Sequence, residues 1–356
     1  MKNMFKYEIF AMALMASVCL LSSCQDWTDT ESLTLRNPSF EEQNPQLYAD
    51  YIKDLKKYKQ AEHKAVFVSF ENPIGIPAKQ AERLTAIPDS VDFICLNNAD
   101  ITPEVESEMV KVREKGTRTL YNINYNNFEE NWKAKAKANP DLTEEDALNY
   151  LGACTDSMLA FCDKHQYDGI VIDYTGRSLV GMVEDVLNQY KGRQQNFFNK
   201  VLDWQGKHTD KTLVFYGNVQ YLAPEMIEML DKYNYIILRT STSTNADELA
   251  LSAYMAVQYG IDTTEESGVN PVPTDRFIVC AQFPKEGDKD KVIGYWETLN
   301  DKGEKTLAVP GSAQWVTEAS PDFTRSGLFI MDIQNDYYNN TYGSVREAIR
   351  IMNPNK

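Results

Sequence analysis

Residues 167–176 are the stretch that decides the fold, and they read Tyr-Asp-Gly-Ile-Val-Ile-Asp-Tyr-Thr-Gly. A turn of small and polar residues at Asp168 and Gly169 leads into the apolar run 170–172, and a polar end follows. This pattern is typical of a strand in a buried parallel sheet whose C-terminal end opens onto a site. Amphipathic helical patterns flank the stretch on both sides, so it belongs to an alternating β/α sequence.

The same alternation continues through the rest of the chain and predicts a (β/α)8 TIM barrel. An open doubly wound parallel sheet would give the same alternation and is the alternative fold. Strand patterns occur at residues 65–70, 91–96, 117–124, 212–216, 235–239, 276–283 and 326–333, in addition to the opening stretch 167–176. Among the connections we expect helices at residues 78–86, 179–191, 194–207, 224–233 and 289–299, and a long insertion at 125–139.

The sequence gives no reason to expect a cofactor or a metal ion. No Gly-x-Gly-x-x-Gly motif follows any predicted strand, so a dinucleotide site lacks its usual marker. The histidines His63, His165 and His208 are scattered and do not have the spacing of zinc ligands.

Residues 1–23 have the pattern of a signal peptide. Lys2 and Lys6 precede an apolar run at 9–21, which is shorter than the ~20 residues that a membrane span needs. The run ends in Leu-Ser-Ser-Cys, which resembles a bacterial lipobox, so we expect lipid on Cys24 and an anchored protein. The alternative is a plain secretory signal followed by a chance cysteine.

The residues that follow Cys24 predict a tether and a location. Residues 24–46 show no periodicity and are expected to form a flexible tether before a barrel domain at 47–356. Asp26, Asp29 and Glu31 resemble the acidic export tag of lipoproteins in Bacteroides-type bacteria. We therefore expect an outer-membrane lipoprotein that faces the cell exterior.

The charge of the chain bears on its ligand. The formal net charge is −16, and the isoelectric point is near 4.7. Nucleic-acid binding needs a basic surface, so this balance argues against a nucleic-acid partner. It is compatible with a neutral ligand.

The stretch 167–176 also resembles a family signature. Glycoside hydrolases of family 18, which include chitinases and endo-β-N-acetylglucosaminidases, carry Asp-Gly-x-Asp-x-Asp-x-Glu on the fourth strand of their barrel. Asp168 and Gly169 match the first pair, and Asp173 matches the last Asp. Val171 stands where the middle Asp is expected, and Thr175 stands where the catalytic Glu is expected.

The resemblance implies a substrate-assisted mechanism in which the acetamido oxygen of the sugar attacks the anomeric carbon. The family Glu protonates the leaving oxygen, and the Asp two residues before it orients the acetamido group. Thr175 cannot act as the acid, because a threonine hydroxyl does not release its proton near neutral pH. Two further positions depart from the family: Met331 replaces a Trp at the sugar floor, and 236–239 lacks the pattern Met-x-Tyr-Asp.

Aromatic, amide and acidic side chains gather where the predicted strands end. In a barrel these ends form one face, and such side chains suit the C–H faces and hydroxyl groups of sugars. Tyr and Asn are also common at loop starts for structural reasons, and a one-residue shift in strand parity would turn a side chain to the helix layer. The candidate ligand-binding residues are Asn124, Tyr125, Asp173, Tyr174, Tyr216, Asn218, Gln282 and Asp332.

These features predict a cell-surface lipoprotein that binds GlcNAc-containing glycans, such as N-glycans, without hydrolysing them. The resemblance also implies partners, namely a glycan importer and an endoglycosidase of the same glycan-use system. Two alternatives remain open. A carboxylate from another strand end, Glu71, Asp332 or Asp336, could replace the missing acid and make the barrel an active hydrolase. A scaffold barrel that contacts only proteins is the second alternative.

Overall fold

The computed structural model describes residues 39–264 and 270–354. The predicted signal peptide, Cys24 and most of the predicted tether lie outside these residues. The chain divides into a unit that ends at Asp50 and a unit that begins at Tyr51. In the first unit, Ser39 caps the short helix α2 (Phe40–Gln43), and α3 (Pro45–Gln60) begins at Pro45. The last residues of the predicted tether are therefore helical.

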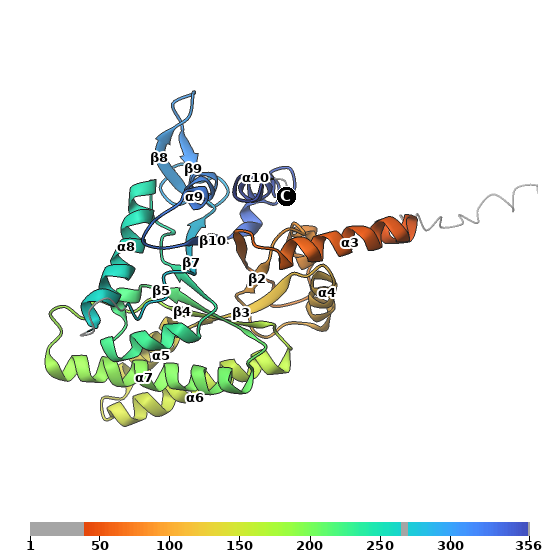
Figure 1. Ribbon diagram of the computed structural model, residues 1–356. Coiled ribbons are helices and arrows are strands. Elements are labelled where there is room, and N and C mark those ends of the chain that lie inside the picture. The colour runs from red at the N-terminus through yellow and green to blue at the C-terminus, as the bar shows by residue number, and fades with distance from the viewer. Residues whose placement is uncertain (1–38, 265–269, 355–356) are drawn as a thin grey trace, which may run out of the picture. The chain divides into compact units, whose positions relative to one another are not determined.

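The second unit is a closed barrel of eight parallel strands in the order β1-β10-β7-β6-β5-β4-β3-β2 (Figure 1). The closed ring confirms the (β/α)8 prediction and excludes the open doubly wound sheet. The strands are β1 (Ala65–Phe70), β2 (Phe93–Leu96), β3 (Arg118–Asn124), β4 (Gly169–Tyr174), β5 (Thr212–Gly217), β6 (Tyr235–Leu238), β7 (Phe277–Gln282) and β10 (Arg325–Met331).

Helices connect the strands, and α6 and α7 lie side by side along the barrel in Figure 1. The α-helices of this unit are α4 (Pro103–Glu114), α5 (Tyr125–Ala138), α6 (Glu144–Lys164), α7 (Glu184–Lys207), α8 (Ala246–Thr263), α9 (Ala308–Thr317) and α10 (Gly343–Met352). The 3-10 segments are η1 (Gln80–Glu82), η2 (Leu84–Ala86), η3 (Val219–Tyr221), η4 (Pro224–Lys232) and η5 (Ile333–Asp336). In the part of the chain that the structure describes, no helix is both long enough and apolar enough to span a bilayer.

Several connections differ from the sequence prediction. The predicted insertion at 125–139 is the helix α5, because Asn124 caps its first turn and Phe128 and Trp132 bury one face. The predicted helix at 289–299 is wrong, since the hairpin of β8 (Tyr295–Leu299) and β9 (Lys305–Leu307) begins there. The segments at 78–86 and 224–233 form 3-10 turns, and the two helices predicted at 179–207 are the single helix α7.

Strand parity decides which side chains face the barrel interior. Val171, Val214 and Tyr216 belong to the interior cluster, whereas Ile172 and Tyr174 belong to the cluster between strands and helices. Asp173 shares the parity of Val171 and therefore points into the barrel. In the registers of β3, β4 and β5, Asn124 lies opposite Asp173, and Asp173 lies opposite Tyr216.

Candidate functional site

A cavity of about 320 Å³ lies inside the C-terminal mouth of the barrel, and we call it the cup. Its lining combines amide and carboxylate side chains with aromatic and thioether side chains. Active sites of barrels of this kind lie at this face, where the loops after the strands meet. The cup is lined by Ser69, Asn97, Tyr121, Asn122, Asn124, Asn127, Phe128, Met158, Asp173, Tyr216, Phe329, Met331 and Asp332.

Asp173 is the acidic side chain at the centre of this arrangement, and 8% of its side chain is exposed. Its Oδ2 accepts a hydrogen bond from Asn124 Nδ2 at 2.9 Å, and its Oδ1 accepts one from Arg239 Nη1 at 2.5 Å. Burial raises the pKa of Asp173 above its usual range, and the positive charge of Arg239 opposes this rise. Each carboxylate oxygen of Asp173 is therefore already engaged by a protein donor.

Tyr216 and Arg239 form a stacked pair beside Asp173. The guanidinium carbon of Arg239 lies 4.4 Å from the ring centroid of Tyr216, which is within the range of a cation–π contact. The Tyr216 hydroxyl donates to Met331 Sδ at 3.4 Å, and burial raises the pKa of Tyr216 well above its ordinary value. Arg239 directly follows β6, at the position where the family resemblance led us to expect an Asp.

Asp332 and Gln282 form a second polar pair at the rim. Gln282 Nε2 donates to Asp332 Oδ2 at 2.6 Å, and the backbone N–H of Asp332 donates to Ser69 Oγ at 3.0 Å. Asp332 adopts left-handed backbone angles with φ 55°, a conformation that Asp tolerates better than most residues. Asp332 lines the cup, whereas Gln282 does not line it, which differs from its predicted place, and is bonded to Asp332 instead.

Thr175 occupies the position that corresponds to the family acid. Asn126 Nδ2 donates a hydrogen bond to Thr175 Oγ1, and Asn218 Nδ2 makes a long contact of 3.5 Å with the Thr175 carbonyl. The Thr175 hydroxyl is thus bound to an amide, and no carboxyl group stands at this position. Asn218 contacts this loop and does not line the cup, which differs from its predicted place.

Tyr125 and Tyr174 were predicted as stacking platforms, and the structure corrects this prediction. Both side chains are 1% exposed and pack in the layer between strands and helices. Their ring centroids are 5.3 Å apart, and Tyr125 also lies 4.4 Å from Phe197 of α7. The parity of β4 explains the error, because Tyr174 follows the inward Asp173 and must point outward. Neither ring can offer a face to a sugar.

The retained half of the family motif lies at the other end of β4. Asp168 Oδ2 accepts hydrogen bonds from Arg113 Nε at 2.8 Å and from the backbone N–H of Thr119 at 2.7 Å, so it ties β4 to β3 and α4. A Cβ on Gly169 would collide with the backbone of Thr212 on β5. Asp168 and Gly169 therefore serve barrel closure, and Val171 fills the barrel interior.

Sequence analysis missed several residues of the cup. Asn97, Asn122, Asn127 and Phe128 line it, although none was among the candidate ligand-binding residues. Asn122 has the inward parity of Asn124, and this signal could have identified it. Its Oδ1 is buried and has no hydrogen-bond partner within residues 39–264 and 270–354. The fold of α5 brings in Asn127 and Phe128, which the predicted insertion concealed.

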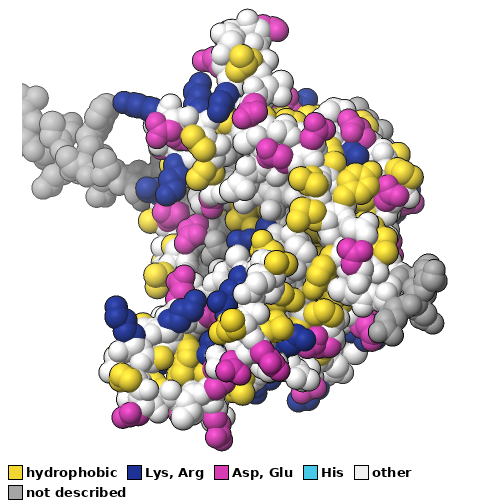
Figure 2. All heavy atoms as spheres, turned by 90° about the vertical axis from the view of Figure 1, so that its left-hand side faces the viewer, with side chains coloured by type: hydrophobic (Ala, Val, Ile, Leu, Met, Phe, Trp, Pro, Cys, Tyr) yellow, Lys and Arg dark blue, Asp and Glu magenta, His cyan; other side chains and the backbone are white. Residues whose placement is uncertain are grey.

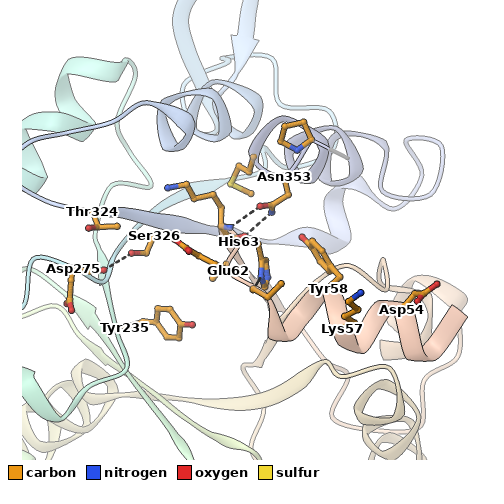
Figure 3. A pocket seen from close by; sticks show the side chains of 15 residues that line it. Asp54, Lys57, Tyr58, Glu62, His63, Tyr235, Asp275, Thr324, Ser326 and Asn353 are labelled. Atoms are coloured by element: carbon orange, nitrogen blue, oxygen red, sulfur yellow. Dashed lines mark hydrogen bonds between the residues drawn. The ribbon is translucent and has the colours of Figure 1, made fainter. Parts of the chain in front are cut away.

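A larger hollow of about 830 Å³ lies at the N-terminal end of the barrel, where Tyr235 begins β6 and Ser326 is the second residue of β10 (Figure 3). Here Lys64 and Asn353 exchange two hydrogen bonds of 2.9 Å that join the start of the barrel chain to its end. His63 Nε2 pairs with Asp92 Oδ1 at 3.0 Å. These groups bind one another, so we assign this end a structural role.

The surface drawn in Figure 2 carries acidic, basic and hydrophobic side chains that are interspersed below the projecting β8–β9 hairpin. Across the described residues 39–264 and 270–354, no group of three or more His, Cys, Asp or Glu side chains is arranged to hold a metal ion. The polar side chains that line the cup are amides, hydroxyls and carboxylates, and the guanidinium of Arg239 is bonded to one of them, Asp173.

The fold and the cup define a parallel (β/α)8 barrel with a polar site at its C-terminal mouth. Comparison with protein families matches residues 28–351 to glycoside hydrolase family 18, BT1044-like, and the chain belongs to this family. Among curated proteins, the comparison found no match.

Comparison with solved structures found similar chains, and the first of the following three supports the same fold. A selenomethionine form of a Glu-to-Gln variant of BT1044 superposes with a TM-score of 0.59 at 17% identity, over 89% of this chain and 96% of the other. A family 18 chitinase from Pseudoalteromonas aurantia gives a TM-score of 0.46 at 11% identity, over 80% of this chain and 99% of the chitinase. A family 18 chitinase from Chromobacterium violaceum gives 0.46 at 13% identity, with 82% and 84% covered.

Proposed function

We propose that this protein binds GlcNAc-containing glycans, of the N-glycan type, in the cup and does not hydrolyse them. The observation that carries the proposal is the state of the acid position. In a family 18 barrel with an open polar cup, Thr175 holds this position, and its hydroxyl is bonded to Asn126. A hydroxyl of this kind cannot protonate a leaving glycosidic oxygen.

The lining of the cup supports a carbohydrate ligand. Asn97, Asn122 and Asn127 offer amide donors and acceptors, and Asp332 offers a carboxylate. Phe128 and the edge-to-face pair of Tyr216 and Phe329 add apolar surface to the same lining. This combination suits hydroxyl groups on one side and C–H groups on the other.

An active hydrolase is the second candidate function, and one observation favours it. Of the three carboxylates that could replace the family acid, Asp332 lines the cup. Glu71 is exposed and accepts a hydrogen bond from Asn97, whereas Asp336 is buried and accepts from the backbone N–H of Val345 at 3.0 Å. A hydrolase would therefore depend on Asp332, and Asp332→Asn would abolish its turnover.

The cellular part of the proposal rests on the sequence. We propose that lipid on Cys24 anchors the barrel to the outer membrane with the cup outside the cell. There it would hand glycans to an importer and receive them from an endoglycosidase of the same system. The residues that bear on this proposal precede the described part of the chain.

A glycan array probed with the protein from Gln25 onward tests the proposed function. We expect binding to N-glycans or chitooligosaccharides, together with no released oligosaccharide when the same protein is incubated with N-glycoproteins. An array without any bound glycan would favour the scaffold alternative. Turnover that Asp332→Asn abolishes would favour the hydrolase.

A further inference from the structure

Compared with the family pattern, Asp173 has lost its role as a free hydrogen-bonding group and Arg239 has gained one. A free carboxylate at Asp173 would accept hydrogen bonds from a ligand, but Asn124 and Arg239 already donate to its two oxygens. With 8% of the side chain exposed, little of this carboxylate can reach a ligand. Asp173 therefore acts as an anchor for its neighbours.

Arg239 has the hydrogen-bonding capacity that Asp173 has lost. A guanidinium carries five N–H donors, and within the described residues Asp173 is the single hydrogen-bond partner of Arg239. Its side chain is 27% exposed, and its position is fixed on one side by Asp173 and on its face by Tyr216. Both of these neighbours line the cup, and Arg239 itself lies behind this lining, in contact with both. A fixed guanidinium with free donors is an arrangement that recognises oxygen acceptors.

Resting on the proposed function, we propose that Arg239 determines ligand selectivity, donating hydrogen bonds to the acyl carbonyl of an N-acetylated sugar. The charges of the site favour this neutral acceptor over a carboxylate. Asp173 already neutralises Arg239, and the second carboxylate of the cup, Asp332, would repel an anion. Asn122, whose buried Oδ1 has no hydrogen-bond partner among the described residues, also lines the cup and adds an acceptor there.

Three trisaccharides that differ at C2 test this inference by calorimetric titration. They are triacetylchitotriose, its fully de-N-acetylated form and cellotriose, and a trisaccharide of β-1,4-linked glucuronate adds the carboxylate. We expect the wild-type protein to prefer triacetylchitotriose to cellotriose by about ten- to a hundredfold, the range for a hydrogen bond from a charged donor. Arg239→Lys and Arg239→Met should lose most of this preference, while their binding of cellotriose changes little.

The controls separate recognition from folding. Arg350→Met removes an exposed arginine of α10 and should leave all affinities unchanged. Because Arg239→Met leaves Asp173 buried without its cation, the double variant Asp173→Asn/Arg239→Met supplies a neutral pair of similar size, and it should also lose the preference.

The results of these titrations distinguish the role of Arg239, the choice of a neutral acceptor and the proposed function. Variants that bind triacetylchitotriose with undiminished preference over cellotriose would overturn the role of Arg239 and leave the proposed function intact. Tighter binding of the glucuronate trisaccharide would overturn the choice of a neutral acceptor. A wild-type protein that binds none of the probes would overturn this inference, and an empty glycan array beside it would contradict the proposed function as well.

Discussion

Asp173 near the end of β4 and Arg239 directly after β6 are joined by a contact of 2.5 Å between Oδ1 and Nη1, although β5 lies between the two strands. The pair lies where the family 18 resemblance led us to expect a carboxylate free to hold an acetamido group. Truncating one member of a buried charge pair affects the other, because the remaining charge loses its compensation. The effects of changing the two residues should therefore depend on each other.

The first prediction concerns this dependence. Asp173→Asn should weaken the binding of triacetylchitotriose about five- to a hundredfold, since Arg239 loses the anchor that positions it. In an Arg239→Met background the same change should have much less effect. A double-mutant cycle measured by calorimetry should give a coupling free energy of ~0.5–3 kcal/mol, and additive effects would show that the two residues act separately.

The second prediction concerns the missing acid. Thr175→Glu restores the residue type of the family motif, but we expect no turnover of chitooligosaccharides or N-glycoproteins. Asp173 stays bound to Arg239, and Val171 leaves the middle position of the motif apolar. Released oligosaccharide is measured by mass spectrometry.

A general acid contributes ~10²–10⁴-fold to a rate. A gain of that size in Thr175→Glu over wild type would mean that the rest of the catalytic site is intact and that only the acid is missing.

The third prediction separates the two aromatic positions of β4 and β5. Tyr174→Leu changes the packing of the helix layer, so it should lower the free energy of unfolding by ~0.5–3 kcal/mol and leave the affinity for glycan unchanged. Tyr216→Leu should weaken binding, because it removes the ring that supports Arg239. Chemical denaturation and calorimetry on both variants provide the comparison, and equal losses of affinity would contradict the assignment of Tyr174 to the core.

Much of the fold was predictable, because the apolar runs of the eight strands and their flanking turns are local signals. The predicted bounds of the strands that became β2, β3, β4 and β5 differ from the observed bounds by at most two residues. The errors occurred where an element depends on tertiary packing. The helix α5 buries Phe128 and Trp132, yet its sequence is rich in Asn and charged residues and resembles an insertion. The β8–β9 hairpin contains a short, mostly exposed strand whose pattern also suits a helix.

The site was predictable only in part, since a list of strand-end residues does not contain side-chain direction. Asn124, Asp173, Tyr216 and Asp332 line the cup as their positions suggested. Tyr125 and Tyr174 do not, because parity turns them to the helices. The pairing of Asp173 with Arg239 joins residues 66 positions apart in sequence, and no local sequence pattern around either residue predicts it.

The fourth prediction uses His63 at the N-terminal end of the barrel. Its hydrogen bond to Asp92 raises the pKa of His63, against the effects of burial and of nearby Lys59. The stabilisation is fully present below the unfolded pKa of about 6.5 and is lost as the pH rises through the higher folded pKa. His63→Gln should therefore cost more stability near pH 5.5 than near pH 8.5.

Urea denaturation of the wild-type protein and of His63→Gln at these two pH values measures the difference. An equal loss of stability at both pH values would show that the charge of His63 contributes nothing.

The fifth prediction concerns the anchor. Cys24→Ser should move the protein from the detergent phase to the aqueous phase on phase partitioning, because the variant cannot carry the lipid. Proteinase added to intact cells should remove the barrel from the wild-type protein if the cup faces outward. A serine variant that still partitions into detergent would contradict the proposed lipidation.

Native mass spectrometry of the protein from Gln25 onward, incubated with triacetylchitotriose, tests the central claim most directly, because it records binding and cleavage in one spectrum. We predict a complex of one protein with one intact trisaccharide that persists through prolonged incubation, with no disaccharide or monosaccharide product. A spectrum with cleavage products, or with no complex at any trisaccharide concentration, would contradict the account of a glycan-binding barrel without hydrolytic activity.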